Sequence, residues 1–277
     1  MQRPFRQVDV FADEPYFGNP VAVVVDGKGL VTEEMQRFAS WTNLSETTFV
    51  MPPEAAGSDY RVRIFTPSRE LPFAGHPTLG TCHAWLADGG TPQRADVIVQ
   101  ECDAGLVELR RTDDGALAFA APPLLRSGPV DDETLHRIVS MLGIGRAEVV
   151  DAQWVDNGPG WVAVLLATAD AVLALRPGPA DLDVGVAGPY PAGSPEAFEV
   201  RAFTPSLGGV GEDPVTGSLN ASLAGWLLAS GHATAPYIAS QGTVLGRRGR
   251  VRISRDPGGA IWVGGSTTVG VTGSVDL

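Results

Sequence analysis

The sequence predicts an α+β protein of two similar halves related by a pseudo-two-fold axis, each a curved mixed β-sheet around a central helix. The segment VRIFTPS at residues 62–68 recurs as VRAFTPS at residues 200–206, with identity at six of seven positions. Strand-like segments come before the first copy, and an apolar helical segment follows each copy. The length of 277 residues corresponds to roughly two domains at ~150 residues each.

The first half is expected to begin with strands and to end on a helix. Turn-forming residues (DEPYFGNP) separate the first two strands, and polar and apolar residues alternate along YRVRIF. Pro77 suits the first turn of a helix, where its missing N–H is not needed, and the Gly89-Gly90 pair supplies a stop. We therefore predict a helix near 77–87 and strands at Phe5–Phe11, Val21–Val25, Thr47–Met51 and Tyr60–Phe65.

The second half is expected to carry an equivalent helix, which Pro214 opens and Gly231 closes. Its segment LNASLAGWLLAS is apolar around most of its circumference, which predicts burial on several sides. A central helix wrapped by a curved sheet satisfies that pattern. The Gly- and Pro-rich stretch 176–195 is expected to form loops.

Two further helices look like ordinary surface helices. One is predicted over Glu33–Trp41, where Thr32 could be the N-cap. The other is predicted over Asp131–Leu142, where Asp131 or Asp132 could be the N-cap.

Composition and charge exclude several classes of function. The net charge of −12 repels nucleic acid and anionic lipid, so neither is an expected partner. The only lysine, Lys28, lies in a turn-like DGKG segment, which leaves no candidate for Schiff-base chemistry. With two cysteines, no leader-like start and no apolar run long enough to span a bilayer, we expect a cytoplasmic protein without a membrane anchor.

Metal and cofactor motifs are missing from the sequence. No pair among the four histidines has the i, i+4 spacing of a helical zinc site, and the two cysteines lie twenty residues apart. GEDPVTGS resembles a phosphate loop but lacks the lysine before its serine, and no dinucleotide fingerprint occurs. We therefore expect no metal and no cofactor.

A second repeated block suggests a binding site. At an offset of 137 residues, His76-Pro77 aligns with Asp213-Pro214, which places His76 and Asp213 at the N-caps of the two central helices. Helix N-termini attract anions, so the two would bind a common ligand if both faced one cleft. Each residue has an ordinary alternative: a histidine bonded to backbone and a plain capping aspartate.

Small residues beside this pair extend the candidate site. Gly75 and Gly217 let backbone amides approach a ligand, and Ser218 adds a hydroxyl, although helix packing of small residues would explain them equally well. Glu46, in NLSETTFV, is one carboxylate among hydroxyl residues, and a single glutamate is more often solvated surface. Together these residues suit proton transfer at carbon: one group moves the proton while oriented donors stabilise the developing charge.

Five segments give the chain a resemblance to the PhzF-like family, named for the phenazine-biosynthesis isomerase. They are QVDVFADEPYFGNPVAVV, NLSETTFV, FTPSRELPFAGHPTLG, GEDPVTGS and SQGTVLGRRGRVRI, and they extend from residue 7 to about residue 252. The chain departs from the family pattern at PFAGHP, where PFNGHP is more typical, and at the arginines 247, 248 and 250. Substrate contacts are therefore expected to differ.

The resemblance implies a diaminopimelate epimerase-like fold, an active site between the halves and a homodimer. It implies halves 1–122 and 123–263, with the C-terminal strand 264–277 returning to the first. In the phenazine enzyme the glutamate of the NLSETTF block moves a proton between ring carbons of trans-2,3-dihydro-3-hydroxyanthranilate. The corresponding glutamate in this sequence is Glu46. The other matching positions would orient and hydrogen-bond the substrate: His76, Asp213, Ser218, Gly75 and Gly217.

We therefore predict a cofactor-independent isomerase in which Glu46 moves a proton on a small carboxylate-bearing substrate. Two alternatives remain open. One is racemase- or epimerase-type proton transfer on an amino acid, although Cys82 and Cys102 stand away from the positions that a two-thiol racemase requires. The other is a metabolite-binding protein that retains the fold without turnover.

Overall fold

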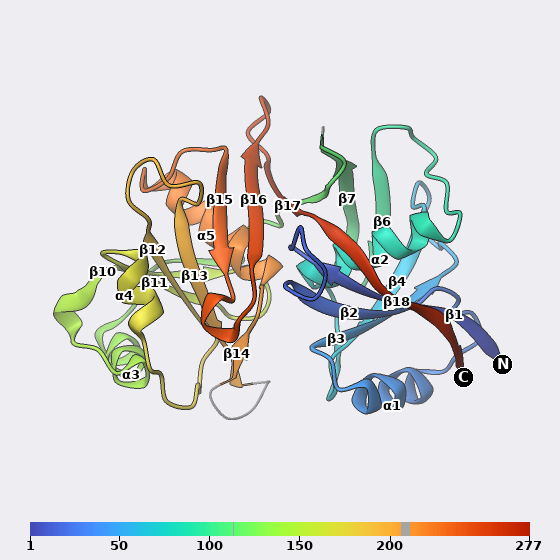
Figure 1. The fold of residues 1–277 in the computed structure, drawn as a ribbon, viewed down its shortest axis with the longest axis horizontal. Helices are drawn as coiled ribbons and strands as arrows, with labels where there is room; N and C mark the ends of the chain where they lie inside the picture. Colours follow the sequence, from blue (N-terminus) through green and yellow to red (C-terminus); the bar gives the residue numbers. More distant parts are fainter. Residues whose placement is uncertain (113, 206–210) are drawn as a thin grey trace. The chain divides into compact units, whose positions relative to one another are not determined.

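The computed structural model describes residues 1–112, 114–205 and 211–277 and divides into two compact units. Unit 1 comprises residues 1–120 and 264–277, and unit 2 comprises residues 121–263 (Figure 1). Ser206, the last residue of the repeated VRAFTPS segment, and residues 207–210 lie outside the described residues. Each unit is α+β, with a large mixed sheet and few helices.

The sheet of unit 1 follows the pairing order β18-β1-β2-β3-β4-β6-β7-β8, with the short β5 on β4. β2 runs parallel to β3 and β4 runs parallel to β6, while the other pairs are antiparallel. The strands are β1 (Gln2–Val10), β2 (Asn19–Val24), β3 (Glu46–Met51), β4 (Tyr60–Phe65), β5 (Glu70–Leu71), β6 (Ile98–Cys102), β7 (Gly105–Arg111), β8 (Leu117–Ala120) and β18 (Thr267–Asp276).

Unit 1 contains a central helix, α2 (Gly75–Ala87), which contacts β1, β2, β3, β8 and β18. It has no polar face because nine of its thirteen residues are buried. Gly80 allows close packing: a Cβ there would meet Val21 Cγ1 at 2.3 Å. The other helix, α1 (Thr32–Thr42), contacts β3 and β4 and buries Met35 and Phe38.

Unit 2 repeats this strand order as β9-β10-β11-β12-β13-β15-β16, with β14 on β13. Its two parallel pairs, β11 with β12 and β13 with β15, also match those of unit 1. The strands are β9 (Arg126–Pro129), β10 (Val149–Asp156), β11 (Val162–Leu166), β12 (Val184–Pro189), β13 (Phe198–Phe203), β14 (Glu212–Asp213), β15 (Tyr237–Gln241) and β16 (Gly249–Arg255). The next strand, β17 (Ile261–Gly265), begins in unit 2 and ends in unit 1.

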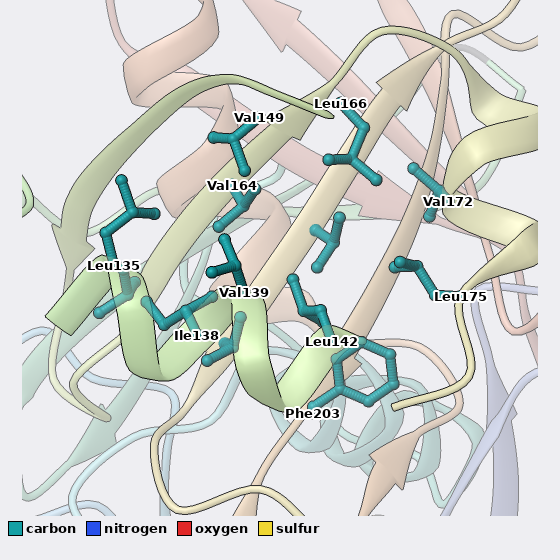
Figure 2. Packing of buried hydrophobic residues seen from close by; sticks show 13 residues of the cluster. Leu135, Ile138, Val139, Leu142, Val149, Val164, Leu166, Val172, Leu175 and Phe203 are labelled. Atoms are coloured by element: carbon teal, nitrogen blue, oxygen red, sulfur yellow. The ribbon is translucent and has the colours of Figure 1, made fainter. Parts of the chain in front are cut away.

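The helices of unit 2 form a buried centre and an outer layer. The central helix α5 (Gly217–Ala229) contacts β10 and β16. On the outer side, α3 (Asp132–Leu142) and α4 (Ala169–Ala174) pack on the strands through a cluster that includes Ile138, Leu142, Val164, Val172 and Phe203 (Figure 2). The described part of this unit also contains the 3₁₀ turns η1 (Arg146–Glu148) and η3 (Thr243–Leu245).

The same ion pair braces the strand before each central helix. Arg63 on β4 binds Glu70 on β5, and Arg201 on β13 binds Glu212 on β14, each through two guanidinium–carboxylate hydrogen bonds. The pair in unit 2 is more deeply buried, with side chains 3% and 7% exposed, against 17% and 25% in unit 1. Arg201 also donates to the carbonyls of Val172 and Leu175.

Three expectations about the elements need correction. Thr32 is the first residue of α1 and not its cap, because Val31 takes the N-cap position and its N–H donates to Glu34 Oε2. The central helix of unit 2 begins at Gly217 and not at Pro214. By contrast, Asp131 caps α3 as expected, accepting from the backbone N–H of Thr134 at 2.8 Å.

The third correction concerns the stretch 176–195, which contains β12 and is not a continuous loop. Its glycines permit close packing within a buried strand. A Cβ on Gly185 would meet Leu219 Cδ1 of α5 at 2.3 Å, and one on Gly188 would meet the carbonyl oxygen of Thr168 at 2.3 Å. In this segment the glycine signal therefore reflects packing against neighbours as well as turns.

Candidate functional site

The two central helices are structural equivalents, with thirteen residues each and glycine first. Gly217 lies 142 residues after Gly75, so His76 and Ser218 share the second helical position. Neither His76 nor Asp213 is an N-cap: Ala74 and Thr216 occupy those positions. The expected alignment of His76 with Asp213 is therefore wrong, because the chain between β13 and α5 is longer than its counterpart in unit 1.

In unit 1 the structure brings Glu46 and His76 together. Glu46 is the first residue of β3, where it pairs with Val21 of β2, and His76 lies in the first turn of α2. Glu46 Oε2 stands 3.3 Å from His76 Nε2, and the side chains are 15% and 5% exposed. Gly75 directly precedes His76, so its backbone amide lies in the same first turn of α2 as the imidazole that contacts Glu46.

The His76 imidazole is neutral at physiological pH. Burial lowers its pKa to about 3, and a hydrogen bond to the Pro20 backbone opposes that shift only in part. Asn19 Nδ2 lies 3.4 Å from His76 Nδ1, on the side of the ring away from Glu46. The contact between His76 and Glu46 is therefore one between a carboxyl group and a neutral ring, and it is not an ion pair at this pH.

The lowered pKa of His76 makes stability depend on pH. Below about pH 6.5 His76 is protonated in the unfolded chain, whereas in the folded chain it stays neutral down to about pH 3. The free energy of unfolding therefore falls as the pH falls through this range. Between pH 7 and pH 5 we expect His76 to account for a loss of about 2 kcal/mol. Urea unfolding of wild type and His76→Gln at pH 7 and pH 5 measures this contribution, because the variant lacks the titrating imidazole. An equal loss of unfolding free energy in the two proteins between these pH values would contradict it.

Asp213, Gly217 and Ser218 belong to unit 2. Asp213 is on β14 and pairs with Ala202, and its carboxylate accepts from the Thr216 hydroxyl. Buried Gln241 holds this segment: its Nε2 donates to Thr216 Oγ1 at 2.9 Å and to the Asp213 carbonyl at 3.2 Å. Gln241 therefore fixes the backbone of Asp213 and directs the Thr216 hydroxyl toward the carboxylate.

Ser218 is held by the loop between β10 and β11. Trp161 Nε1 donates to Ser218 Oγ at 3.1 Å, and Asn157 Nδ2 donates to the Ser218 carbonyl at 3.0 Å. All three side chains lie within the buried part of unit 2.

The carboxyl group of Glu46 has no counterpart in unit 2. The first parallel pair of β11 and β12 joins Val162 to Val184, so buried Val184 takes the place that Glu46 holds in unit 1. The two thiols are also unsuited to act as bases. Burial raises the pKa of Cys82 to about 12 and also raises the pKa of Cys102.

Four residues beside the predicted set were not identified from the sequence: Asn19, Asn157, Trp161 and Gln241. Asn19 and Gln241 lie inside segments that carry the family resemblance, FGNP and SQG, and that signal could have found them. Asn157 and Trp161 lie in DNGPGW, where turn residues gave no indication of a helix contact.

No helix in the described part of the chain is long and apolar enough to cross a membrane.

The fold places this chain in the class of epimerase-like α+β proteins. A predicted epimerase from Pseudomonas aeruginosa superimposes with a TM-score of 0.81 and 24% identity over 99% of both chains, which shows the fold. The model of the family described as phenazine biosynthesis-like protein matches residues 8–274. The chain belongs to this PhzF family.

Curated relatives of similar length support the assignment. The trans-2,3-dihydro-3-hydroxyanthranilate isomerase of Pseudomonas aeruginosa is 36% identical over 88% of this chain and 87% of that protein. A Schizosaccharomyces pombe protein named antisense-enhancing sequence 1 is 36% identical over 98% of each chain. Further relatives are also named isomerases, and the present chain is an isomerase of the PhzF family.

Proposed function

We propose that this isomerase moves a proton between two carbons of a small carboxylate-bearing substrate, without a cofactor, and that Glu46 is the acid/base. The observation that carries the proposal is the 3.3 Å contact between Glu46 Oε2 and His76 Nε2 at the start of α2. The Glu46 carboxylate accepts a proton from one carbon and returns it to another. Protons and electrons balance without a co-reactant.

His76 and Asp213 complete the proposed machinery. The neutral imidazole of His76 lies beside the carboxyl group of Glu46, so this neighbour adds no positive charge to the acid/base group. The amides of Gly75 and Gly217 and the hydroxyl of Ser218 would hold the carboxylate and stabilise negative charge that develops on the substrate.

A single acid/base group favours proton movement within one face of the substrate. Racemisation by two bases needs a second proton donor on the opposite face, and Val184 occupies the equivalent of Glu46 in unit 2. The substrate named for the Pseudomonas aeruginosa relative, trans-2,3-dihydro-3-hydroxyanthranilate, is a cyclic dienoic amino acid and is the first substrate to assay.

Turnover in deuterium oxide tests the proposal. We expect the ultraviolet spectrum of trans-2,3-dihydro-3-hydroxyanthranilate to change as its double bonds migrate, with no added metal or cofactor. Mass spectrometry then reports how much deuterium enters the product from the Glu46 carboxyl group. Optical inversion of an amino acid without an ultraviolet change would instead support epimerisation. Binding of these acids without exchange would support a metabolite-binding protein.

The homodimer that the resemblance implies is proposed for this chain as well. Sedimentation velocity of the purified protein tests it, since a species of 29.0 kDa alone would contradict a dimer.

A further inference from the structure

The hydroxyl of Ser218 has an unusual neighbour. Trp161 Nε1 donates to Ser218 Oγ at 3.1 Å, and the indole is 4% exposed. Trp161 is the last residue before β11, while Ser218 is the second residue of α5, so the contact joins segments far apart in the sequence. The matching place in unit 1 has a comparable contact, since Asn19 at the start of β2 approaches His76 in α2.

The loop that carries Trp161 is fixed independently of Ser218. Asp156 Oδ1 accepts from the backbone N–H groups of Gly158 and Gly160, both at 2.7 Å. These glycines adopt φ of 140° and 101°, a region that L side chains avoid. The N–H of Val155 also donates to the Trp161 carbonyl at 3.0 Å. The indole is therefore positioned by its own loop.

The opposite end of the contact is fixed as well. Asn157 Nδ2 donates to the Ser218 carbonyl at 3.0 Å, and Asn157 is 9% exposed. One loop therefore holds both the backbone and the side chain of Ser218, which restricts movement of the first turn of α5.

The hydrogen bond between Trp161 and Ser218 runs in one direction only, from the indole to the hydroxyl. An indole N–H can only donate, so it occupies one lone pair of Ser218 Oγ. The hydroxyl keeps one hydrogen to donate, and the structure gives that hydrogen no acceptor among the residues it describes. With its oxygen already engaged, the hydroxyl directs its hydrogen away from the indole.

We propose that Trp161 is a positioning residue that makes Ser218 a hydrogen-bond donor, so that the substrate group meeting Ser218 is an acceptor such as a carboxylate or carbonyl oxygen. This rests on the proposed function, in which Ser218 contacts the substrate. An ammonium or amide N–H at this place would meet an oxygen with one of its two lone pairs already engaged by the indole, and it would leave the hydroxyl hydrogen without an acceptor. Trp161 thereby selects the chemical character of the group bound at the start of α5.

A thiol probe tests the positioning without a substrate. In Ser218→Cys, iodoacetamide alkylation is followed as a function of pH, with wild type as the background because Cys82 and Cys102 are buried. A donor to the thiolate lowers its pKa, so adding Trp161→Phe is expected to raise the alkylation midpoint by about half to one pH unit. Trp154→Phe, in the same hairpin, is the matched control and should leave the midpoint unchanged.

Two results in this assay would overturn the proposal. An unchanged midpoint in Ser218→Cys with Trp161→Phe would show that the indole does not act on position 218. Absence of alkylation at any pH would show that position 218 does not face space open to a ligand.

Kinetics with trans-2,3-dihydro-3-hydroxyanthranilate tests the effect on the substrate. Trp161→Phe is expected to raise KM about 5–10-fold with a smaller change in kcat, since binding of the acceptor group is weakened. Ser218→Ala should show the same pattern, and the double variant should lose little more than Ser218→Ala alone. Additive losses would contradict action through Ser218. If wild type does not turn over this compound, the same kinetic comparison is made with another substrate of the proposed class, while the thiol assay still decides the role of Trp161.

Discussion

Glu46→Gln is expected to lower kcat about 10²–10⁴-fold with trans-2,3-dihydro-3-hydroxyanthranilate, the range that loss of a general acid/base usually costs. The amide keeps the size and shape of the side chain, so the fold should be preserved. It cannot accept a proton from carbon at neutral pH. The loss should therefore appear in kcat and in deuterium exchange, with thermal stability close to that of wild type.

Glu33→Gln is the matched control for this substitution. Glu33 is exposed in the first turn of α1 and contributes at most a few tenths of a kcal/mol through the helix dipole. Its activity should equal that of wild type. Deuterium exchange by Glu46→Gln at the wild-type rate would falsify the acid/base assignment and would direct attention to Asp213, the other carboxylate of the predicted set.

The duplicated architecture could be predicted from the sequence because hydrophobic pattern and repeated motifs carry it. The recurrence of VRIFTPS as VRAFTPS falls on β4 and β13, and each copy carries the arginine of the duplicated ion pair. The apolar circumference of the segment at 219–230 predicted a buried helix, which α5 confirms. Patterns of this kind extend over many residues, so tertiary packing rarely overrides them.

Single positions at the site were harder to predict. Pro214 has the local character of a helix start, yet α5 begins three residues later at Gly217. The displacement follows from β14, which pairs Asp213 with Ala202, and from Gln241, which holds the segment between strand and helix. These contacts come from residues far away in the sequence, and local helix signals do not report them.

The contact between Glu46 and His76 shows a similar division. The sequence indicated both residues, but only the parallel register of β2 and β3 places Glu46 at the strand end that faces the start of α2. A one-residue slip in that register would turn the side chain to the other face of the sheet. Strand register therefore decides whether these two residues can act together.

Arg201→Ala is expected to lower the free energy of unfolding by about 3–5 kcal/mol. The substitution leaves the Glu212 carboxylate uncompensated in a site where its side chain is 7% exposed, and it removes donors to the carbonyls of Val172 and Leu175. The cost comes from a buried charge without a partner and not only from the lost attraction. Urea unfolding followed by far-ultraviolet circular dichroism measures the loss.

The duplicated pair supplies its own control. Arg63→Ala removes the same interaction in unit 1, where the carboxylate of Glu70 is 25% exposed and water can solvate it, so a loss of only about 1–2 kcal/mol is expected. Adding Glu212→Gln to Arg201→Ala should recover part of the stability, because it removes the stranded charge. Equal losses for Arg201→Ala and Arg63→Ala, or no recovery with Glu212→Gln, would mean that packing of the arginine stems and not burial of charge governs both pairs.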